Sequence, residues 1–301
     1  MRSLVSVIIP AYNAKNYIRE TVESALGQTY RNYEIIVVDD GSTDGTGEIL
    51  KDYQDRIIYL RKDNGGPASA RNMGIKKSRG ELIAFLDADD VWLPDKLEKQ
   101  VKFLEENPQI HLLFTAVIGY EDGRVYPVEE NRLRGSIFHQ LLKGNFITTS
   151  TVMVRRECLE EELFDEDRNL ISVEDYNLWL RLSRKYVFGY LDEPTIKYRF
   201  RGGLTDNFEA MFKADFYNFR KLRETFPEWR LEINPFYWIG LSSYHFKAGK
   251  EFFYFQKYFQ ARKEFLLSFL TCPIQLKPLL WLTISLLPSK LINRLRGKKS
   301  R

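Results

Sequence analysis

Three aspartates follow a short apolar stretch in the first third of the chain. Residues 82–86 are apolar, and Asp87, Asp89 and Asp90 come within the next four positions. Carboxylates one residue apart in a turning backbone can face the same small volume, where their hard oxygen atoms suit Mg²⁺ or Mn²⁺ and, through the cation, a diphosphate. A second Asp-x-Asp at residues 165–167 follows no apolar stretch, so we interpret it as a solvated turn.

The apolar stretch before these aspartates is one of four expected strands. Strand-length apolar segments alternate with helical patterns of apolar residues at spacings of three and four, and these segments are residues 5–9, 33–38, 57–60 and 82–86. Such a series predicts an α/β fold with parallel strands, right-handed crossovers and helices on both faces. Helix caps are expected at Asp44 or Thr46 and at Ser69.

Each expected strand ends in a polar cluster. The four clusters are residues 10–13, 39–42, 63–66 and 87–90. Because the carboxyl ends of parallel strands form one edge of an open sheet, where ligands bind, the four clusters are expected to converge. This convergence is much stronger support for a ligand site than any single motif.

Several functional classes are disfavoured by what the chain lacks. The first turn, residues 10–13, has no glycine, which disfavours a nicotinamide or flavin oxidoreductase, and there is no P-loop motif. The net charge of +4 comes from residues 289–301, which hold six Lys or Arg and no acid, so the body has no broad nucleic-acid footprint. Cys158 and Cys272 have no metal-binding spacing, and no signal-peptide core is visible, which fits a reducing cytoplasm.

Five segments together resemble a known family. In order and spacing, they match the inverting GT-A glycosyltransferases of family 2, and they are residues 5–13, 37–44, 70–72, 85–90 and 174–179. The resemblance covers about residues 3–200. It implies a GT-A, Rossmann-like, mostly parallel sheet in a domain of residues 1–205. It also implies transfer of a sugar from a nucleotide diphosphate donor, with inversion and with a divalent metal, Mn²⁺ or Mg²⁺.

The resemblance also implies residues for the nucleotide. Pro10, Ala11 and Tyr12 would line the pocket for the base and ribose, and Asp40 would accept a hydrogen bond from the base imide, usually that of uracil. Each has a structural alternative: Tyr12 could pack at the sheet edge, and Asp39 or Asp40 could cap the following helix.

Three further residues are implied for the diphosphate. Asp89 would hold the metal, Asp87 would bind the ribose or a metal-bound water, and Arg71 would support the carboxylates or a phosphate. The metal would stabilise the charge that builds on the departing diphosphate. As the alternative, Arg71 could be an ordinary residue on a helix surface.

A general base is expected near residue 175. Inversion in one displacement needs a group that takes the proton of the acceptor hydroxyl. Glu174 and Asp175 precede an apolar-rich helix, and the family pattern implies that Asp175 is the base while Glu174 supports it or contacts the acceptor. A carboxylate at a helix start could instead be a cap that favours the helix dipole.

The acceptor side is expected in residues 111–154. We expect a strand at residues 112–118, a hairpin around residues 121–124 and another strand at residues 146–154. The three histidines have no ligand spacing and are interpreted as structural or surface residues. Some relatives recruit a later histidine to the metal, but residues 197–201 offer none, so the rest of the metal shell stays open.

Residues 206–301 are expected to form a separate helical region. It is rich in aromatic residues at helical spacing, which is typical of a core. The apolar segment at residues 279–287, with Trp281 and a following basic cluster, is too short to span a bilayer but fits a helix in the membrane interface. The alternative is a terminal helix packed in a core or an oligomer contact.

The sequence therefore favours a peripheral enzyme at the cytoplasmic face of a membrane. We expect it to move a hexose or N-acetylhexosamine from a UDP-sugar to a saccharide or lipid-linked acceptor in surface polysaccharide synthesis. Two rivals are a sugar nucleotidyltransferase, which would want a glycine-rich first turn, and a non-catalytic nucleotide-sugar binding or scaffold protein.

Overall fold

The computed structural model describes residues 3–130, 133, 136–199, 208–254, 256–274 and 276–287. The chain divides into two compact units, Met1–Asp215 and Phe216–Arg301, each described separately below. The boundary expected at residues 205 and 206 lies outside the described residues.

The first unit is built on parallel strands at its amino-terminal end. Four strands pair in the order β3-β2-β1-β4, all parallel to their neighbours, as the alternating pattern predicts. They are β1 (Val5–Ala11), β2 (Tyr33–Asp39), β3 (Ile58–Arg61) and β4 (Leu82–Phe85). Their carboxyl ends therefore meet at one edge of the sheet.

Beyond β4 the sheet becomes mixed. One strand, β8, lies antiparallel between β4 and β6, and β6 then pairs in parallel with β9. Within the described residues, the sheet has nine strands. The remaining ones are β5 (Val91–Trp92), β6 (Leu112–Gly119), β7 (Val125–Tyr126), β8 (Met153–Arg155) and β9 (Phe188–Tyr198).

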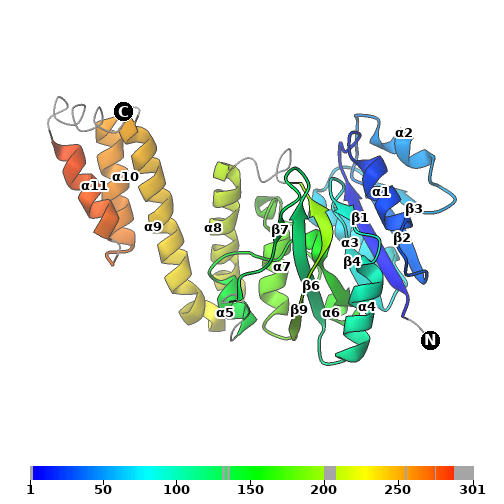
Figure 1. Cartoon of the computed structure of the whole chain (residues 1–301). Helices are drawn as coiled ribbons and strands as arrows, with labels where there is room; N and C mark the ends of the chain where they lie inside the picture. The colour runs from blue at the N-terminus through cyan, green and yellow to red at the C-terminus, as the bar shows by residue number, and fades with distance from the viewer. Residues whose placement is uncertain are drawn as a thin grey trace. The chain divides into compact units, whose positions relative to one another are not determined.

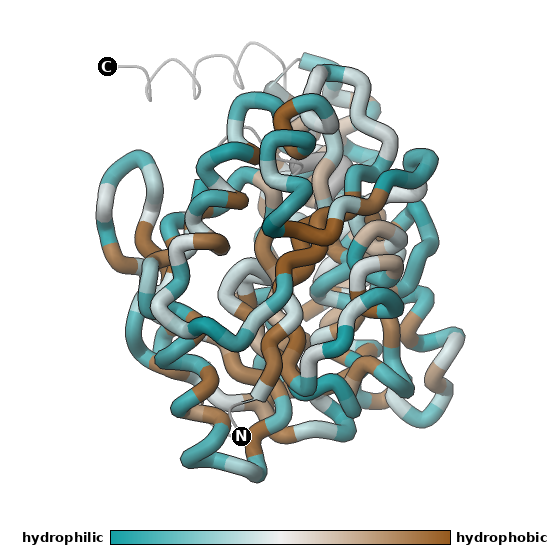
Figure 2. The backbone as a smooth tube through the Cα atoms, turned by 90° about the vertical axis from the view of Figure 1, so that its right-hand side faces the viewer, coloured by the Kyte–Doolittle hydropathy of each residue, from teal (hydrophilic) through white to brown (hydrophobic). Residues whose placement is uncertain are grey.

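Helices cover both faces of this sheet because its strand residues are apolar on both sides. On one face Val37 belongs to a large buried cluster that includes residues of α1, α2 and α4, whereas Ile36 and Val38 pack on the other face with Ala70 of α3. Figure 1 shows the helices on either side of the sheet, and Figure 2 shows apolar residues, in brown, gathered in the interior. The helices of this unit are α1 (Ile18–Leu26), α2 (Thr46–Lys51), α3 (Pro67–Lys77), α4 (Lys96–Glu106), α5 (Ile137–Leu141), α6 (Glu157–Glu161) and α7 (Glu174–Leu182).

Two local predictions were wrong. Helix α3 begins at Pro67 after Gly66, whose φ of 91° suits glycine, so Ser69 lies inside the helix and does not cap it. The strand expected at residues 146–154 is instead a loop, a 3-10 turn at Thr149–Thr151 and the short β8. The cause is that the hydroxyl of Thr151 donates to the carbonyl of Thr148, a local bond that competes with a sheet ladder.

The second unit is helical, as its composition predicts. Phe253, Ala261 and Phe265 form its buried cluster, against which Trp281 packs. No helix in the described residues is both long and apolar enough to cross a membrane. With α8 running across the division between the units, its helices are α8 (Phe208–Thr225), α9 (Arg230–Tyr254), α10 (Tyr258–Thr271) and α11 (Leu276–Leu286).

Candidate active site

The turn between β4 and β5 carries the three aspartates. Asp87 and Asp89 are partly exposed, whereas Asp90 is 1% exposed. Burial and the neighbouring charge of Asp87 raise the pKa of Asp89 to about 6, and burial raises the pKa of Asp90 well above its usual range. The turn therefore concentrates negative charge that a bound cation would relieve.

Helix α1 holds the backbone of this turn. The hydroxyl of Thr21 lies 2.8 Å from the carbonyl oxygens of both Ala88 and Asp90. One turn further along α1, the hydroxyl of Ser24 accepts a hydrogen bond from the backbone N–H of Trp92 at 3.1 Å. Two hydroxyls of α1 thus fix backbone groups on both sides of Asp89, the expected metal ligand.

Arg199, at the end of β9, holds the same turn from the other side. Its Nε donates to the carbonyl of Asp89 at 2.6 Å and its backbone N–H donates to the carboxylate of Asp90 at 3.2 Å. Its guanidinium pairs with Glu20 of α1 at 2.5 Å and lies 3.4 Å from the ring centre of Tyr120. An arginine therefore braces the turn in the segment where no histidine was found.

Arg71 of α3 joins the aspartate turn to α7. It is 4% exposed and makes ion pairs of 2.7 Å with both Asp87 and Glu174. Burial alone would lower the pKa of Arg71, but the two carboxylates raise it. The alternative interpretation, that Arg71 is an ordinary residue on a helix surface, is therefore wrong, because Arg71 is buried and connects α7 to the aspartate turn.

Asp175 lies beside Glu174 at the start of α7. Its carboxylate accepts hydrogen bonds from the hydroxyl of Thr149 at 2.7 Å and from the backbone N–H of Tyr176 at 2.6 Å. Burial and the negative charge of Glu174 raise the pKa of Asp175 to about 7. A carboxylate with a pKa near neutrality is suited to general base catalysis.

Glu174 has a different environment from Asp175. It is 5% exposed, one oxygen is paired with Arg71, and within the described residues the other oxygen has no hydrogen-bond partner. This placement fits the supporting role expected for Glu174. Contact with the acceptor stays a prediction.

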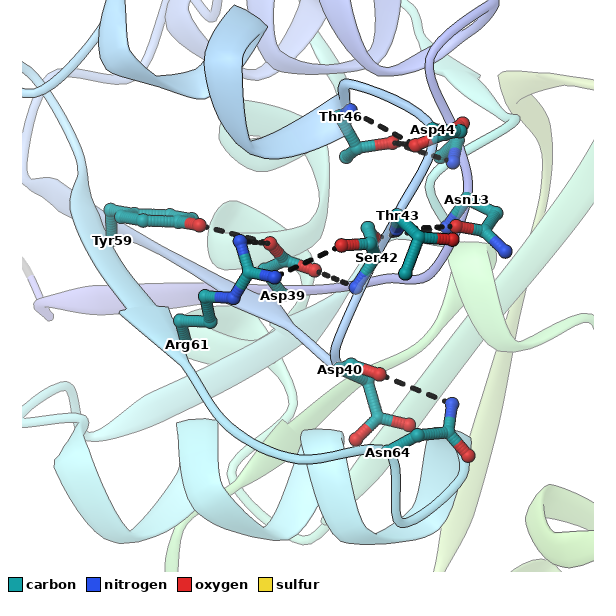
Figure 3. Close-up of polar contacts among 11 residues, drawn as sticks. Asn13, Asp39, Asp40, Ser42, Thr43, Asp44, Thr46, Tyr59, Arg61 and Asn64 are labelled. Carbon is teal, nitrogen blue, oxygen red and sulfur yellow. Dashed lines mark hydrogen bonds and ion pairs between the residues drawn. The ribbon is translucent and has the colours of Figure 1, made fainter.

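The end of β2 separates two neighbouring aspartates. The carboxylate of Asp39 accepts from the backbone N–H of Ser42 at 2.8 Å and the hydroxyl of Tyr59 at 2.9 Å, and Figure 3 shows it pointing away from that of Asp40. Asp39 thus closes the turn after its own strand and does not cap α2, whose Thr46 bonds to Asp44.

Asp40 holds the loop that leads into α3. Its two carboxylate oxygens accept from the backbone N–H groups of Gly65 and Gly66 at 2.9 and 2.7 Å, and Lys62 pairs with it at 2.7 Å. Asp40 therefore anchors the helix that carries Arg71. Its expected bond to a base imide stays a prediction.

The end of β1 lies next to these residues. Pro10 and Ala11 are buried, and the carbonyl of Ala11 accepts from the backbone N–H of Asp40 at 2.8 Å. Tyr12 is 54% exposed, so it is not packed in the sheet edge. An exposed ring at this position is available to stack on a ligand.

These contacts unite part of the predicted site. Arg71 connects Asp87 directly to Glu174, and α3 connects that pair to Asp40. The sequence analysis did not identify Thr149, Ser150 or Arg199. For Thr149 and Ser150 the signal was a run of four hydroxyl residues, 148–151, inside an expected strand; Arg199 lies outside this run.

The aspartate turn fits a divalent cation. Within the described residues, no group of three or more His, Cys, Asp or Glu side chains forms a ready metal site. Mg²⁺ is usually bound by one or two carboxylates plus substrate phosphates rather than by an all-protein cage. Asp89, with Asp87 beside it, provides such a partial set, and Arg71 already neutralises one oxygen of Asp87.

The mostly parallel sheet with helices on both faces has the architecture of the GT-A fold. The model of glycosyl transferase family 2 matches residues 6–163, more than half of the chain. The chain belongs to this family.

Individual proteins that are similar in sequence to this chain also carry glycosyltransferase names. The chain is 36% identical over 204 residues to the putative teichuronic acid biosynthesis glycosyltransferase TuaG of Bacillus subtilis, a match that covers 66% of this chain and 79% of that protein. It is 41% identical over 206 residues to an uncharacterized glycosyltransferase of Rickettsia bellii, covering 67% of this chain but 29% of that protein. The chain thus spans about a third of the length of several Rickettsia relatives.

The fold also matches solved structures. S. aureus TarS 1–349 in complex with UDP-GlcNAc is similar with a TM-score of 0.62 and 20% identity, covering 98% of this chain and 92% of that one. The same protein in complex with UDP matches with a TM-score of 0.54 and 26% identity, covering 71% and 65%. The expected GT-A fold is confirmed.

Proposed function

We propose that this chain is an inverting, metal-dependent glycosyltransferase. It would move a hexose or N-acetylhexosamine from a UDP-sugar to a saccharide or lipid-linked acceptor in cell-surface polysaccharide synthesis. The observation that carries the proposal is the Arg71 bridge, with 2.7 Å ion pairs to Asp87 and to Glu174. It ties the aspartate turn, proposed to bind the cation, to Glu174, the neighbour of the proposed base Asp175. A cation site and a base are the two parts that a single displacement needs.

The donor nucleotide would bind where β1 and β2 end. The exposed ring of Tyr12 would stack on the base above Pro10 and Ala11, and Asp40 would accept from the base imide. Carboxylate oxygens have two lone pairs each, so Asp40 can hold the α3 loop and still accept a further bond. The complex of TarS with UDP supports uracil as the base.

The diphosphate would lie over the aspartate turn. Asp89 would hold Mn²⁺ or Mg²⁺, with Asp87 placed for the ribose or a metal-bound water. When bound, the metal supplies Lewis-acid stabilisation to the leaving diphosphate. Arg71 holds Asp87 by an ion pair, and removing Asp87 would leave the buried charge of Arg71 less compensated.

Asp175 would act as the base. Its carboxylate takes the proton of the acceptor hydroxyl as the acceptor oxygen bonds to the anomeric carbon and the bond to the diphosphate breaks on the opposite side. Glu174 and Arg71 hold the start of α7, so that the carboxylate of Asp175 stays in place.

A nucleotide-sugar panel tests the function. The full chain is incubated with Mn²⁺ and each of several UDP- and GDP-sugars, and hydrolysis and thermal shift are measured. We expect a UDP-sugar to give both a shift and metal-dependent hydrolysis. Binding of UDP without hydrolysis or transfer to any acceptor would favour a scaffold protein instead.

We also propose that the second unit binds the inner face of the cell membrane. Apolar side chains are exposed around α11: Ile274 is 91%, Leu276 70% and Leu280 59% exposed. The basic residues expected to meet anionic lipid are in residues 289–301, which lie outside the described part of the chain. A lipid-linked acceptor gives the enzyme a reason to act there, and similarity to TuaG supports a surface polysaccharide.

A further inference from the structure

A short turn of hydroxyl residues contacts both halves of the proposed site. Thr149, Ser150 and Thr151 form a 3-10 turn in which no residue is more than 4% exposed. The hydroxyl of Thr149 donates to the carboxylate of Asp175 at 2.7 Å. The hydroxyl of Ser150 accepts from the backbone N–H of Asp87 at 3.0 Å. These two direct hydrogen bonds connect the 3-10 turn at residues 149–151 to the proposed base, Asp175, and to the aspartate turn at residues 87–90, which is proposed to bind the cation.

The protein core holds the backbone of this turn. The indole N–H of Trp92 donates to the carbonyl of Ser150 at 3.0 Å. The carbonyl of Thr151 accepts from Lys96 at 3.1 Å and from Gln100 at 2.8 Å. Because these donors are buried, the turn is a rigid platform and its hydroxyls have fixed positions.

Lys96 bonds to the backbone of this turn, although burying its amine is energetically unfavourable. Its side chain is fully buried, lies 4.8 Å from the ring centre of Trp92 and bonds to Gln100. Burial lowers the pKa of Lys96 well below its usual range. A buried amine is destabilising unless its bonds are made, so its placement against the turn is specific.

We propose that Thr149 is a positioning residue that orients the carboxylate of Asp175 toward the acceptor hydroxyl, and that Ser150 fixes the cation-binding turn relative to it. This inference rests on the proposed glycosyl transfer and deepens it. Neither hydroxyl takes part in bond making, since each acts through the group it bonds.

The hydrogen bonds define how Asp175 is held. The backbone N–H of Tyr176 donates to one carboxylate oxygen and the hydroxyl of Thr149 donates to the other. With both oxygens bonded, rotation of the carboxylate is restricted, and the remaining lone pairs point in defined directions. Both donors favour the ionised form and so lower the pKa of Asp175 against the effect of burial.

Other charged groups also act on Asp175. Glu174 raises the pKa of Asp175 and Arg71 lowers it, and Tyr198 of β9 is influenced by the charge of Asp175 in turn. None of these three side chains bonds to Thr149 among the described residues. A substitution at Thr149 therefore changes one hydrogen bond and leaves the neighbouring charges in place.

Thr149→Val tests the proposed role of Thr149 in orienting Asp175. It keeps the shape of the side chain and removes the hydroxyl, whereas Thr149→Ser keeps the hydroxyl. Thr148→Val is the matched control, because no hydrogen bond of the Thr148 hydroxyl is seen among the described residues. Folding is checked by UDP binding, and Thr149→Ala is a second variant should valine prevent folding.

The readouts are the pH profile of transfer and the titration of Asp175 itself. The carboxyl signal of Asp175 is observed by NMR in ¹³C-aspartate-labelled protein and assigned with Asp175→Asn. We expect Thr149→Val to raise the pKa of Asp175 by roughly one unit, and to move the acid side of the pH profile of transfer to higher pH by the same amount. At pH values below this pKa, transfer by Thr149→Val then falls about tenfold, while Thr149→Ser and Thr148→Val stay near the wild type.

Ser150→Ala tests the proposed role of Ser150 in fixing the aspartate turn, and this test does not rely on turnover. It should weaken Mn²⁺-dependent UDP affinity, measured by calorimetry, about threefold to tenfold, and leave UDP affinity without metal unchanged. Equal titration of Asp175 in Thr149→Val and Thr148→Val would overturn the role of Thr149, and unchanged metal dependence in Ser150→Ala would overturn that of Ser150. Full turnover by Asp175→Asn would instead overturn the proposed base.

Discussion

At the scale of single residues, two adjacent carboxylates have separate tasks. Glu174 is buried and paired with Arg71, whereas Asp175 bonds to neutral donors and has a pKa raised to about 7. The negative charge of Glu174 raises the pKa of Asp175 and so makes Asp175 a stronger base.

Asp175→Asn is expected to keep donor binding and lose transfer by roughly 10²–10⁴-fold, the usual contribution of a general base. The amide preserves the size of the side chain but accepts no proton. The measurement is kcat for transfer together with UDP affinity. Normal turnover with normal affinity would remove Asp175 from the base role.

The pKa of Asp175 also predicts a pH dependence. Because the base acts when deprotonated, transfer with saturating Mn²⁺ should rise through about pH 7. The folded pKa lies above the unfolded value of about 3.9, so the folded state binds more protons between pH 4 and 7 and its stability falls as the pH rises there.

Asp175→Asn removes the free-energy penalty of ionising this buried carboxyl group, because the amide does not titrate in this pH range. Relative to the wild type, its melting temperature should therefore rise between pH 4 and pH 7, by roughly 2–4 °C for each kcal/mol of that penalty. Melting curves of both proteins across this range check the sign. A difference that grows as the pH falls would contradict the raised pKa.

Asp89→Ala is expected to lose the metal-dependent part of UDP affinity. The carboxylate would supply a hard oxygen ligand in the turn, and the diphosphate supplies the others. Calorimetric titration of UDP with and without Mn²⁺ measures this, and we expect a loss of at least tenfold only when Mn²⁺ is present. Asp165→Ala, in the second Asp-x-Asp, where the partly exposed carboxylate of Asp165 accepts from the backbone N–H of Asp167, is the matched control.

At the scale of elements, α3 places Arg71 because it lies close against β1. A Cβ at Gly74 would be 2.6 Å from the side chain of Ile8, so only glycine permits this approach. The same helix is anchored at its start by Asp40 through Gly65 and Gly66.

Gly74→Ala should therefore lower both stability and transfer. Overpacking costs about 1–3 kcal/mol, which exceeds the gain of about 1 kcal/mol from the helix propensity of alanine. Calorimetric melting and kcat are measured beside Gly240→Ala, whose Cβ meets nothing within 4 Å in α9. We expect the control to be neutral or slightly stabilised; equal behaviour of the two variants would contradict the close approach.

At the scale of the molecule, the second unit buries one side of α11 and exposes the other. Trp281, Leu282 and Ile284 pack on the cluster of Phe253 and Phe265, as expected for a terminal helix packed in a core, whereas contact with a membrane stays a prediction. Deleting residues 274–301 would expose that cluster, which makes point substitutions the cleaner test.

Replacing Ile274, Leu276 and Leu280 together by Asn should reduce binding to vesicles that contain anionic lipid by at least tenfold. The loss follows from the apolar area removed, since net charge is unchanged. Vesicle flotation measures it, and Val187→Asn, an exposed apolar residue of the first unit, is the control. Undiminished flotation of the triple variant would argue against a membrane surface here.

Local patterns predicted much of the fold. Residues 5–9, 33–38, 57–60 and 82–86 are rich in apolar residues at strand length, and each overlaps a parallel strand. Burial on both faces favours such runs in the inner strands β1, β2 and β4, whereas no residue of the edge strand β3 is buried. The hydroxyl residues 148–151 misled the prediction, since β-branched threonines suit a strand until side-chain bonds to the backbone are known.

The sequence by itself determined the α/β class, the edge where the polar clusters meet and the identity of the candidate carboxylates, because these depend on composition and short spacing. Only the tertiary structure decided that Arg71 bridges Asp87 and Glu174, and that Thr149 holds Asp175. These bonds join residues up to 103 positions apart, and such pairings arise from packing that no local pattern encodes.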